Sequence, residues 1–296
     1  MSEHKIHFVY FKNFLKQAGY TVEFVHEVTE EMCICYWVFM RNKIKWADHK
    51  RIGSKLKKQQ AGLSPATIIL RTRTLKAQFN YYKKKGYIEE NPWQEFNLEN
   101  EEATPRYWNE QELTRLFESV DRSTFEGERN FALFTFLLDT GARISEALQL
   151  NEWDMDLESG EVYFSAQITK NKCPRTSPLA KDTISLLKSL FKKNASYRTS
   201  GSHAAFITAS GTRLKYSGAR YCLVSKEKKA KIKRPHLHQF RHSFAVHYTL
   251  SGGDESSLRD IGGWKTEKAI KRYRKIRTNE LKVQHQKFSP VNKLFI

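Results

Sequence analysis

The sequence predicts a mainly helical protein with one small antiparallel β-sheet, arranged as two domains. Apolar residues recur with a period near 3.6 along most of the chain, which is typical of amphipathic helices. Residues 161–168 instead alternate strictly between apolar and polar, the pattern of a half-buried strand. A polar, acidic segment separates a helical first part from the part that holds this strand. The chain has 296 residues, enough for two hydrophobic cores.

The predicted domain boundaries follow these changes in pattern. We expect a helical domain over residues 1–95, a linker over 96–107, a second domain over 108–280 and a C-terminal tail over 281–296. The hydrophobic fraction of 40% and the aromatic fraction of 13% are those of a folded chain.

The first domain contains a long helix with recognisable ends. Ser64-Pro65 is a typical helix start. Lys83, Lys84 and Lys85 place positive charge in the last turn, and Gly86 follows as a C-cap. The apolar residues at helical spacing in between are Ile68, Ile69, Leu75, Phe79 and Tyr82.

The second domain begins after Thr104-Pro105, which ends the linker. Asn109 and Glu112 have the spacing of a capping box and predict a helix start. Residues 130–138 form an apolar run that predicts a buried helix, ending at Asp139-Thr140-Gly141.

A β-hairpin follows. Glu161–Ile168 is the first predicted strand, Thr169–Pro174 the turn and Arg175–Leu179 the returning strand. After Asp182 the pattern is again mostly helical.

The charge distribution points to a polyanionic partner. The net charge is +19, with +13 over residues 41–85, −14 over 86–161 and +15 over 201–296. Two basic surfaces favour nucleic acid, whose condensed counterions are released on binding. We expect no membrane association, because there is no apolar run of about 20 residues and no basic amphipathic anchor at either end.

The cysteines and the N-terminus predict a cytoplasmic protein. Four scattered cysteines do not form a disulfide scaffold, and the first residues lack a signal peptide's basic start and apolar run. Cys33-x-Cys35 is half a zinc site without a second pair. His238 and His242 have the spacing of a metal pair but no evident third ligand. We therefore expect no metal.

Several positions carry groups suited to phosphodiester chemistry. Arg143 follows a glycine turn at a helix start, where backbone N–H groups favour an anion. Lys170 lies in the predicted hairpin turn, and His238 and Arg241 lie three apart on one helix. Each alone has a structural explanation: a surface arginine, a solvated lysine, a core histidine. Trp264 and Tyr273 would likewise be a core residue and part of a cationic helix face.

The order of these residues resembles the tyrosine recombinase (phage integrase) family. Residues 140–148 (TGARISEAL) resemble its first arginine box, and residues 169–179 (TKNKCPRTSPL) its lysine hairpin. His238-Gln239-Phe240-Arg241-His242 matches its His-x-x-Arg box, and Gly263-Trp264 through Tyr273 its nucleophile segment. The resemblance covers roughly residues 63–280 and keeps the family order.

This resemblance implies a metal-independent and ATP-independent reaction without a cofactor. Tyr273 would attack the scissile phosphate, forming a 3′-phosphotyrosine and releasing a 5′-hydroxyl. Arg143 and Arg241 would hold the non-bridging oxygens, since guanidinium stays charged and forks onto two oxygens. Lys170 would protonate the leaving oxygen, and His238 would handle the tyrosine proton.

The roles of three further residues in or near these boxes rest on fewer observations. Glu146 would orient its neighbours rather than react. Many family members have histidine in place of Trp264; indole has an N–H donor but no base, so Trp264 can bond a phosphate oxygen or buttress Tyr273. Lys172 competes with Lys170 as the general acid, and the spacing to Pro178 favours Lys170.

The resemblance also implies how the protein would bind DNA. The helical first domain would be the family's core-binding (SAM-like) domain, forming a C-shaped clamp on duplex DNA with the α+β catalytic domain. Residues 226–234 hold six cations and one glutamate, either as a DNA contact or as a solvated loop. The candidate DNA-contact residues are Lys55, Lys57, Lys58, Arg71, Arg73, Lys76, Lys228, Lys229, Lys231, Lys233 and Arg234.

A compact two-domain, Xer/Cre-like enzyme of a mobile element fits these features. It would act at the nucleoid on a double-stranded recombination site, as a homo-tetramer that passes through a Holliday junction. Free protein would be a monomer or weak dimer, and DNA-bending accessory proteins are possible partners. The tail would dock on a neighbouring protomer or fold back on its own domain.

Two other functions stay open on the sequence. One is a type IB topoisomerase-like nicking-closing enzyme, and the other is a non-catalytic DNA-binding relative. Integration, excision, resolution and inversion are equally compatible with the sequence.

Overall fold

The computed structural model describes residues 3–42, 62–96, 105–199, 201–267, 269–270 and the single positions Tyr273, His285, Ser289 and Val291. The chain divides into two compact units, residues 1–102 and 103–296. The division falls inside the segment expected to be a linker. None of the described helices is long and apolar enough to cross a membrane.

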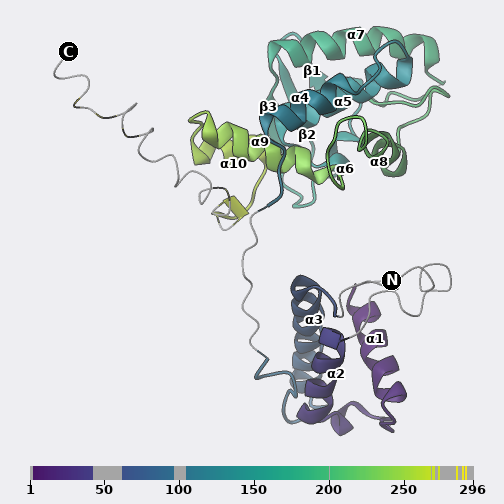
Figure 1. Ribbon diagram of the computed structural model, residues 1–296, viewed down its shortest axis with the longest axis vertical. Coiled ribbons are helices and arrows are strands. Elements are labelled where there is room, and N and C mark those ends of the chain that lie inside the picture. Colours follow the sequence, from purple (N-terminus) through teal and green to yellow (C-terminus); the bar gives the residue numbers. More distant parts are fainter. Residues whose placement is uncertain are drawn as a thin grey trace. The chain divides into compact units, whose positions relative to one another are not determined.

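The first unit is helical (Figure 1). Its elements are α1 (Glu3–Gln17), the short 3-10 helix η1 (Val25–Glu27), α2 (Glu30–Asn42) and α3 (Pro65–Lys84). Aromatic side chains fill the core between the helices. The rings of Phe11 and Trp93 meet edge to face at 5.5 Å, and Phe14 packs on Tyr36 at 5.1 Å.

The predicted ends of α3 are confirmed. The Ser64 side chain accepts a hydrogen bond from the Thr67 backbone N–H, and Pro65 occupies the first turn. At the other end Lys83 and Lys84 lie in the last turn. Gly86 has φ +75°, a left-handed conformation that glycine adopts at low cost.

The second unit combines helices with a small sheet (Figure 1). Its helices are α4 (Glu110–Glu118), α5 (Phe125–Thr140), α6 (Ile144–Ala147), η3 (Glu152–Asp154), α7 (Lys181–Tyr197), α8 (Tyr216–Val224), α9 (His238–Leu250) and α10 (Glu255–Gly262). The capping box at the start of α4 is confirmed. Asn109 accepts from the Glu112 N–H at 2.9 Å, and Glu112 accepts from the Asn109 N–H at 3.1 Å.

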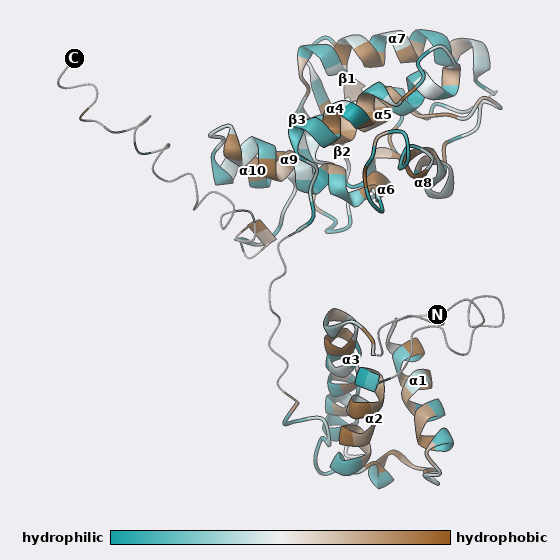
Figure 2. Cartoon of the chain, in the orientation of Figure 1, coloured by the Kyte–Doolittle hydropathy of each residue, from teal (hydrophilic) through white to brown (hydrophobic). Residues whose placement is uncertain are grey.

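α5 is the central helix of this unit and packs on both α7 and α9. It is buried along most of its length, as the apolar run at 130–138 predicts. Phe134 stacks on Phe240 of α9 with ring centroids 5.0 Å apart. α7 alternates hydrophilic and hydrophobic bands along its length (Figure 2), because one side faces the core and the other faces solvent.

The sheet has three antiparallel strands in the order β1-β2-β3: β1 (Met155–Asp156), β2 (Glu161–Phe164) and β3 (Arg175–Pro178). The predicted hairpin is therefore confirmed, but its first strand is shorter than expected. β2 ends at Phe164 because the Ser165 carbonyl accepts from the N–H groups of Ile168 and Thr169, which turns the chain. Residues 165–174 form the connecting turn, and the alternation over 165–168 was misleading.

After Asp182 the described chain is mostly helical, as expected, and the stretch between α7 and α8 is the main exception. Residues 201 and 211 are glycines with φ +78° and +76°, and the chain between them forms isolated bridges. Ala204 pairs with Asn151, and Ile207 pairs with Arg213. These pairings, of which the one between Ala204 and Asn151 is long-range, satisfy backbone groups that a helix would have satisfied locally.

Candidate active site

A glycine turn at the end of α5 sets the position of Arg143. Gly141 has φ +59° and caps α5. A Cβ at this position would lie 2.2 Å from the Phe244 ring, so both conformation and space require glycine. Arg143 follows as the N-cap of α6, as the sequence predicts.

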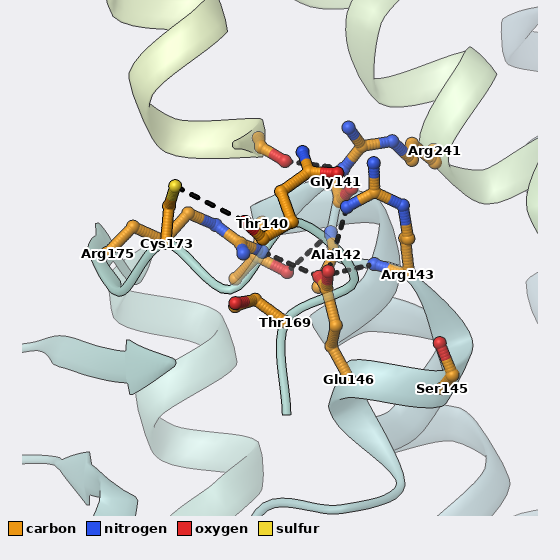
Figure 3. Close-up of polar contacts among 12 residues, drawn as sticks. Thr140, Gly141, Ala142, Arg143, Ser145, Glu146, Thr169, Cys173, Arg175 and Arg241 are labelled. Carbon is orange, nitrogen blue, oxygen red and sulfur yellow. Dashed lines mark hydrogen bonds and ion pairs between the residues drawn. The ribbon is translucent and has the colours of Figure 1, made fainter. Parts of the chain in front are cut away.

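The carboxylate of Glu146 joins two arginines (Figure 3). Its side chain is fully buried. Oε1 accepts from Arg143 Nη1 at 2.8 Å, and Oε2 accepts from Arg175 Nη2 at 2.9 Å and from the Arg143 backbone N–H at 3.1 Å. Burial raises the pKa of the Glu146 carboxyl, but Arg175 and Arg143 outweigh it, so the pKa lies below its usual value. These contacts agree with the orienting role expected of Glu146, which stays a prediction.

Arg175 is a further member of this cluster, and none of the sequence predictions assigns it a role. Its Nε donates to the Ile261 carbonyl at 3.1 Å, and its guanidinium lies 4.0 Å from the Phe164 ring centroid. The sequence signal for the burial of Arg175 is that alternate residues of the returning strand face the core. Arg175 and Ser177 share its inner face, whereas Thr176 is exposed.

Arg241 is almost completely buried in α9, at 2% exposure. Nη1 donates to the carbonyls of Gly141 at 2.6 Å and Gly262 at 2.5 Å. Burial and the nearby Arg143 lower the pKa of Arg241 to about 9, which leaves it charged at neutral pH. Nη2 is buried and has no hydrogen-bond partner among the described residues, although a buried charged donor normally has one. An anion beside Arg143 would satisfy it.

Tyr273 packs in a small core with Trp264. Its side chain is 1% exposed, and the two rings meet edge to face at 5.9 Å. The Arg241 guanidinium lies 3.7 Å from the Trp264 ring centroid. A Cβ at Gly262 would come 1.9 Å from the Trp264 ring, so this glycine lets the indole lie on the backbone. Trp264 thus links Arg241 to Tyr273 by packing.

The hydroxyl of Tyr273 lies 2.6 Å from Nδ1 of His242. The family resemblance implies instead that His238 handles the tyrosine proton. His238 is exposed, and its ring meets the His242 ring at 4.7 Å between centroids. His242 directly follows Arg241 in the sequence, and this position is the sequence signal for its place in the site, although the spacing from His238 suggests only half of a metal pair.

The two candidate general acids, Lys170 and Lys172, are exposed in the turn between β2 and β3. Their neighbours Thr169, Asn171 and Cys173 line a pocket of about 380 Å³. Arg143, Arg175, Arg259, Trp264 and Lys265 line the same pocket. The turn therefore lies beside the arginine cluster, and the choice between the two lysines stays a prediction.

The basic segment between α8 and α9 presents its cations to solvent from an anchored backbone. Ala230 and Ile232 are buried, and Arg115 donates from Nε to the Ala230 carbonyl at 3.1 Å. The exposed cations are Lys228, Lys229, Lys231, Lys233 and Arg234.

The candidate DNA contacts of the first unit differ from one another. Arg73 is exposed on α3. Arg71 lies over the Tyr10 ring at 4.3 Å, and Lys76 donates to the Gln94 carbonyl at 2.6 Å. Lys55, Lys57 and Lys58 lie outside the described residues, as does most of the tail over 281–296.

Among the residues that the structure describes, no three His, Cys, Asp or Glu side chains are grouped so that they could hold a metal ion. Cys33 is buried in the core of the first unit, and its neighbour Cys35 packs against that core.

Comparison with known proteins is consistent with this site. The phage integrase family matches residues 106–280, more than half of the chain. The chain belongs to the phage integrase family. Within it, the protein is a tyrosine-type, site-specific DNA recombinase.

Its relatives include tyrosine recombinases XerC. The protein from Oceanobacillus iheyensis is 26% identical over 77% of this chain and 76% of its own, and that from Bacillus licheniformis is 29% identical over 69% and 68%. Among solved structures, the Tn1549 transposon integrase with a circular intermediate DNA has a TM-score of 0.70 at 19% identity, covering 92% of this chain and 89% of its own. A XerH recombinase bound to difH substrate has a TM-score of 0.64 at 23% identity, with coverage of 92% and 74%.

Proposed function

We propose that this recombinase cuts and rejoins duplex DNA through a covalent bond between Tyr273 and the 3′-phosphate. The Tyr273 oxygen forms a bond to phosphorus while the bond from phosphorus to the 5′-oxygen breaks. Free tyrosine has a pKa near ~10 and is a weak nucleophile at neutral pH, so a base and nearby cations must activate it. The next cut strand supplies the 5′-hydroxyl that reverses the reaction.

The observation that carries this proposal is the buried Arg241 beside Arg143. A phosphate oxygen would accept from Arg241 Nη2, which has no partner among the described residues. Arg143 is held by Glu146 with its side chain 21% exposed, so it can reach the same phosphate. Two guanidinium groups would stabilise the charge that develops on the non-bridging oxygens, with no metal in the step.

Two protons move in this reaction. The phenol proton would go to a histidine, and the 2.6 Å contact favours His242 over His238. A proton from Lys170 would go to the leaving 5′-oxygen. Trp264 would buttress Tyr273 by packing. Its indole has no basic nitrogen, which leaves proton transfer to the histidine and the lysine.

The DNA partner and assembly complete the proposal. In the solved structures named above, the Tn1549 integrase is bound to a circular intermediate DNA and the XerH recombinase to a difH substrate, and the basic charge of this chain suits such a partner. We infer a homo-tetramer on two sites, with a Holliday junction between the strand exchanges. We further infer that it acts at the nucleoid in the cytoplasm, where its DNA would be.

A nicked suicide substrate tests the nucleophile. It carries the recombination site of the native element and is incubated with protein in EDTA, then run on a denaturing gel. We expect a 3′-linked adduct with wild type and none with Tyr273→Phe, which keeps the buried ring. Tight binding without an adduct would leave a DNA-binding relative, and relaxation of plasmids that lack the site would indicate a topoisomerase-like enzyme.

The same substrate separates the two histidines. A lost general base costs about 100-fold or more in rate, so we expect a loss of that order for His242→Ala and a smaller one for His238→Ala, measured as single-turnover adduct formation. His242→Asn keeps a hydrogen-bonding group near the Nδ1 position but cannot titrate. A larger loss of rate for His238→Ala than for His242→Ala would instead assign the phenol proton to His238.

A further inference from the structure

We propose that Arg175 is a positioning residue that holds the lysine-bearing turn in place for cleavage. This inference rests on the proposed function, because it assigns Arg175 a role toward the general acid. No catalytic contact is required of Arg175 itself. It acts through the segments to which it is bonded.

Arg175 lies at the base of the turn. Residues Phe164 and Arg175 are the last pair of the β2–β3 ladder, and the turn that carries Lys170 spans the residues between them. The Arg175 guanidinium also lies over the Phe164 ring at 4.0 Å. One side chain therefore joins both ends of this turn, in addition to the backbone pairing.

The same guanidinium ties the turn to the first arginine box. Arg175 Nη2 donates to Glu146 Oε2 at 2.9 Å. The Glu146 carboxylate also accepts hydrogen bonds from the Arg143 side chain and from the Arg143 backbone N–H. The general-acid turn and the phosphate-binding arginine are thus bonded to one buried carboxylate.

A third link runs to the end of α10, which precedes the tyrosine segment. The Ile261 carbonyl accepts from Arg175 Nε at 3.1 Å and from Ser177 Oγ at 2.7 Å. The next carbonyl, that of Gly262, accepts from Arg241. Arg175 and Arg241 therefore hold adjacent carbonyl groups of the same helix end.

The space around Arg175 leaves little freedom. Gly263 has φ +68°, and a Cβ there would lie 2.9 Å from Arg175 Cδ and 3.0 Å from Nε and Nη1. The Arg175 side chain is 9% exposed. Lysine has a single ammonium in place of the planar fork, so Arg175→Lys cannot make both the Glu146 and the Ile261 bonds in their present directions.

Replacing Arg175 should displace Lys170 relative to the leaving 5′-oxygen. Arg143 keeps two bonds to Glu146 when Arg175 is replaced, so phosphate binding is largely retained. The turn loses its tie to the rest of the site, and an error of about 1 Å in a reacting group can cost about 100-fold in rate. Loss of Arg175 should therefore resemble a partial loss of Lys170.

A change of leaving group tests this mechanism. The suicide substrate is made with the ordinary 5′-oxygen and with a bridging 5′-sulfur at the scissile position. Thiols have a pKa near ~8.5, so a thiolate leaves without a general acid. For Arg175→Lys we expect single-turnover cleavage of the oxygen substrate to fall by about 100-fold, with most of the rate recovered on the sulfur substrate and with unchanged DNA affinity.

Two further variants complete the design. Arg213 is a matched control, since its guanidinium donates to the carbonyls of Leu148 and Leu150, outside the turn; Arg213→Lys should show no preference for sulfur. Ser177→Ala removes only one bond to Ile261 and covers the case in which Arg175→Lys fails to fold. Ser177→Ala should also cleave the sulfur substrate faster than the oxygen substrate, with a smaller loss of rate on the oxygen substrate than Arg175→Lys.

The outcomes separate this inference from the proposed function. Equal losses on both substrates for Arg175→Lys, or for Ser177→Ala in its place, would overturn the positioning role while the Tyr273-dependent adduct stands. Failure of the wild-type protein to form that adduct would overturn the proposed function and this inference with it.

Discussion

The buried carboxylate of Glu146 shows how one residue sets the electrostatics of the site. Removing it would leave Arg143 and Arg175 without their common partner, and breaking a buried ion pair typically costs about 3–5 kcal/mol. We expect Glu146→Gln to lower the free energy of unfolding at neutral pH by this order, measured by urea denaturation.

The same residue makes a prediction about pH. The pKa of Glu146 is lower in the fold than its ordinary value. Its contribution is therefore fully present above the unfolded pKa of ~4.3 and is lost as the pH falls through the folded pKa. As the pH is lowered from 6 into the acid range, the free energy of unfolding should fall further for wild type than for Glu146→Gln.

An exposed carboxylate provides the control for both measurements. The side chain of Glu158 is 88% exposed and pairs with Lys188. Because exposed ion pairs contribute about 0–1 kcal/mol, Glu158→Gln should differ little from wild type. Parallel acid curves for wild type and Glu146→Gln would contradict the assigned role of this carboxylate.

At the scale of elements, the left-handed turn after α5 determines where the first arginine box begins. Gly141→Ala combines a left-handed conformation, which costs about 1–2 kcal/mol for other residues, with a clash against Phe244 of about 1–3 kcal/mol. We expect a loss of a few kcal/mol in thermal or urea unfolding, and weaker adduct formation.

Gly252 offers the matched comparison within the same unit. It has φ +92°, and a Cβ there would meet nothing within 4 Å. Gly252→Ala therefore carries the conformational cost without the clash. Equal losses for the two variants would show that the contact between Gly141 and Phe244 is unimportant.

At the scale of the whole molecule, the uneven charge predicts salt-dependent binding. Each phosphate neutralised contributes about −0.9 to the slope of log K against log salt. If the loop before α9 contacts the backbone, replacing Lys228 and Lys229 by glutamine should reduce the slope by about 1–2, measured by fluorescence anisotropy on the target duplex.

Cations on α7 serve as the control for charge alone. Lys181 and Lys192 are exposed, and replacing both by glutamine removes the same net charge. This double variant should leave the slope close to that of wild type. If both pairs lower the slope equally, the loop before α9 has no special place in the DNA interface.

Much of this protein could be predicted from the sequence because the signals are local. The caps of α3 and α4 and the buried run of α5 involve residues a few positions apart, and the two strands of the hairpin are joined by one short turn. Each family box is a contiguous segment of the sequence, so the order of the boxes indicates the family without any knowledge of tertiary contacts. Local hydrogen bonds and periodicity suffice for such features.

Only the tertiary structure decided which groups meet. His242 and Tyr273 are 31 residues apart, Arg175 and Ile261 are 86 apart, and Arg241 and Gly141 are 100 apart. The early end of β2 likewise depends on turn hydrogen bonds that the alternation does not reveal. A sequence pattern reports the face on which a side chain lies, whereas its partner depends on how distant elements pack, and here that packing gave Arg175 and His242 their places in the site.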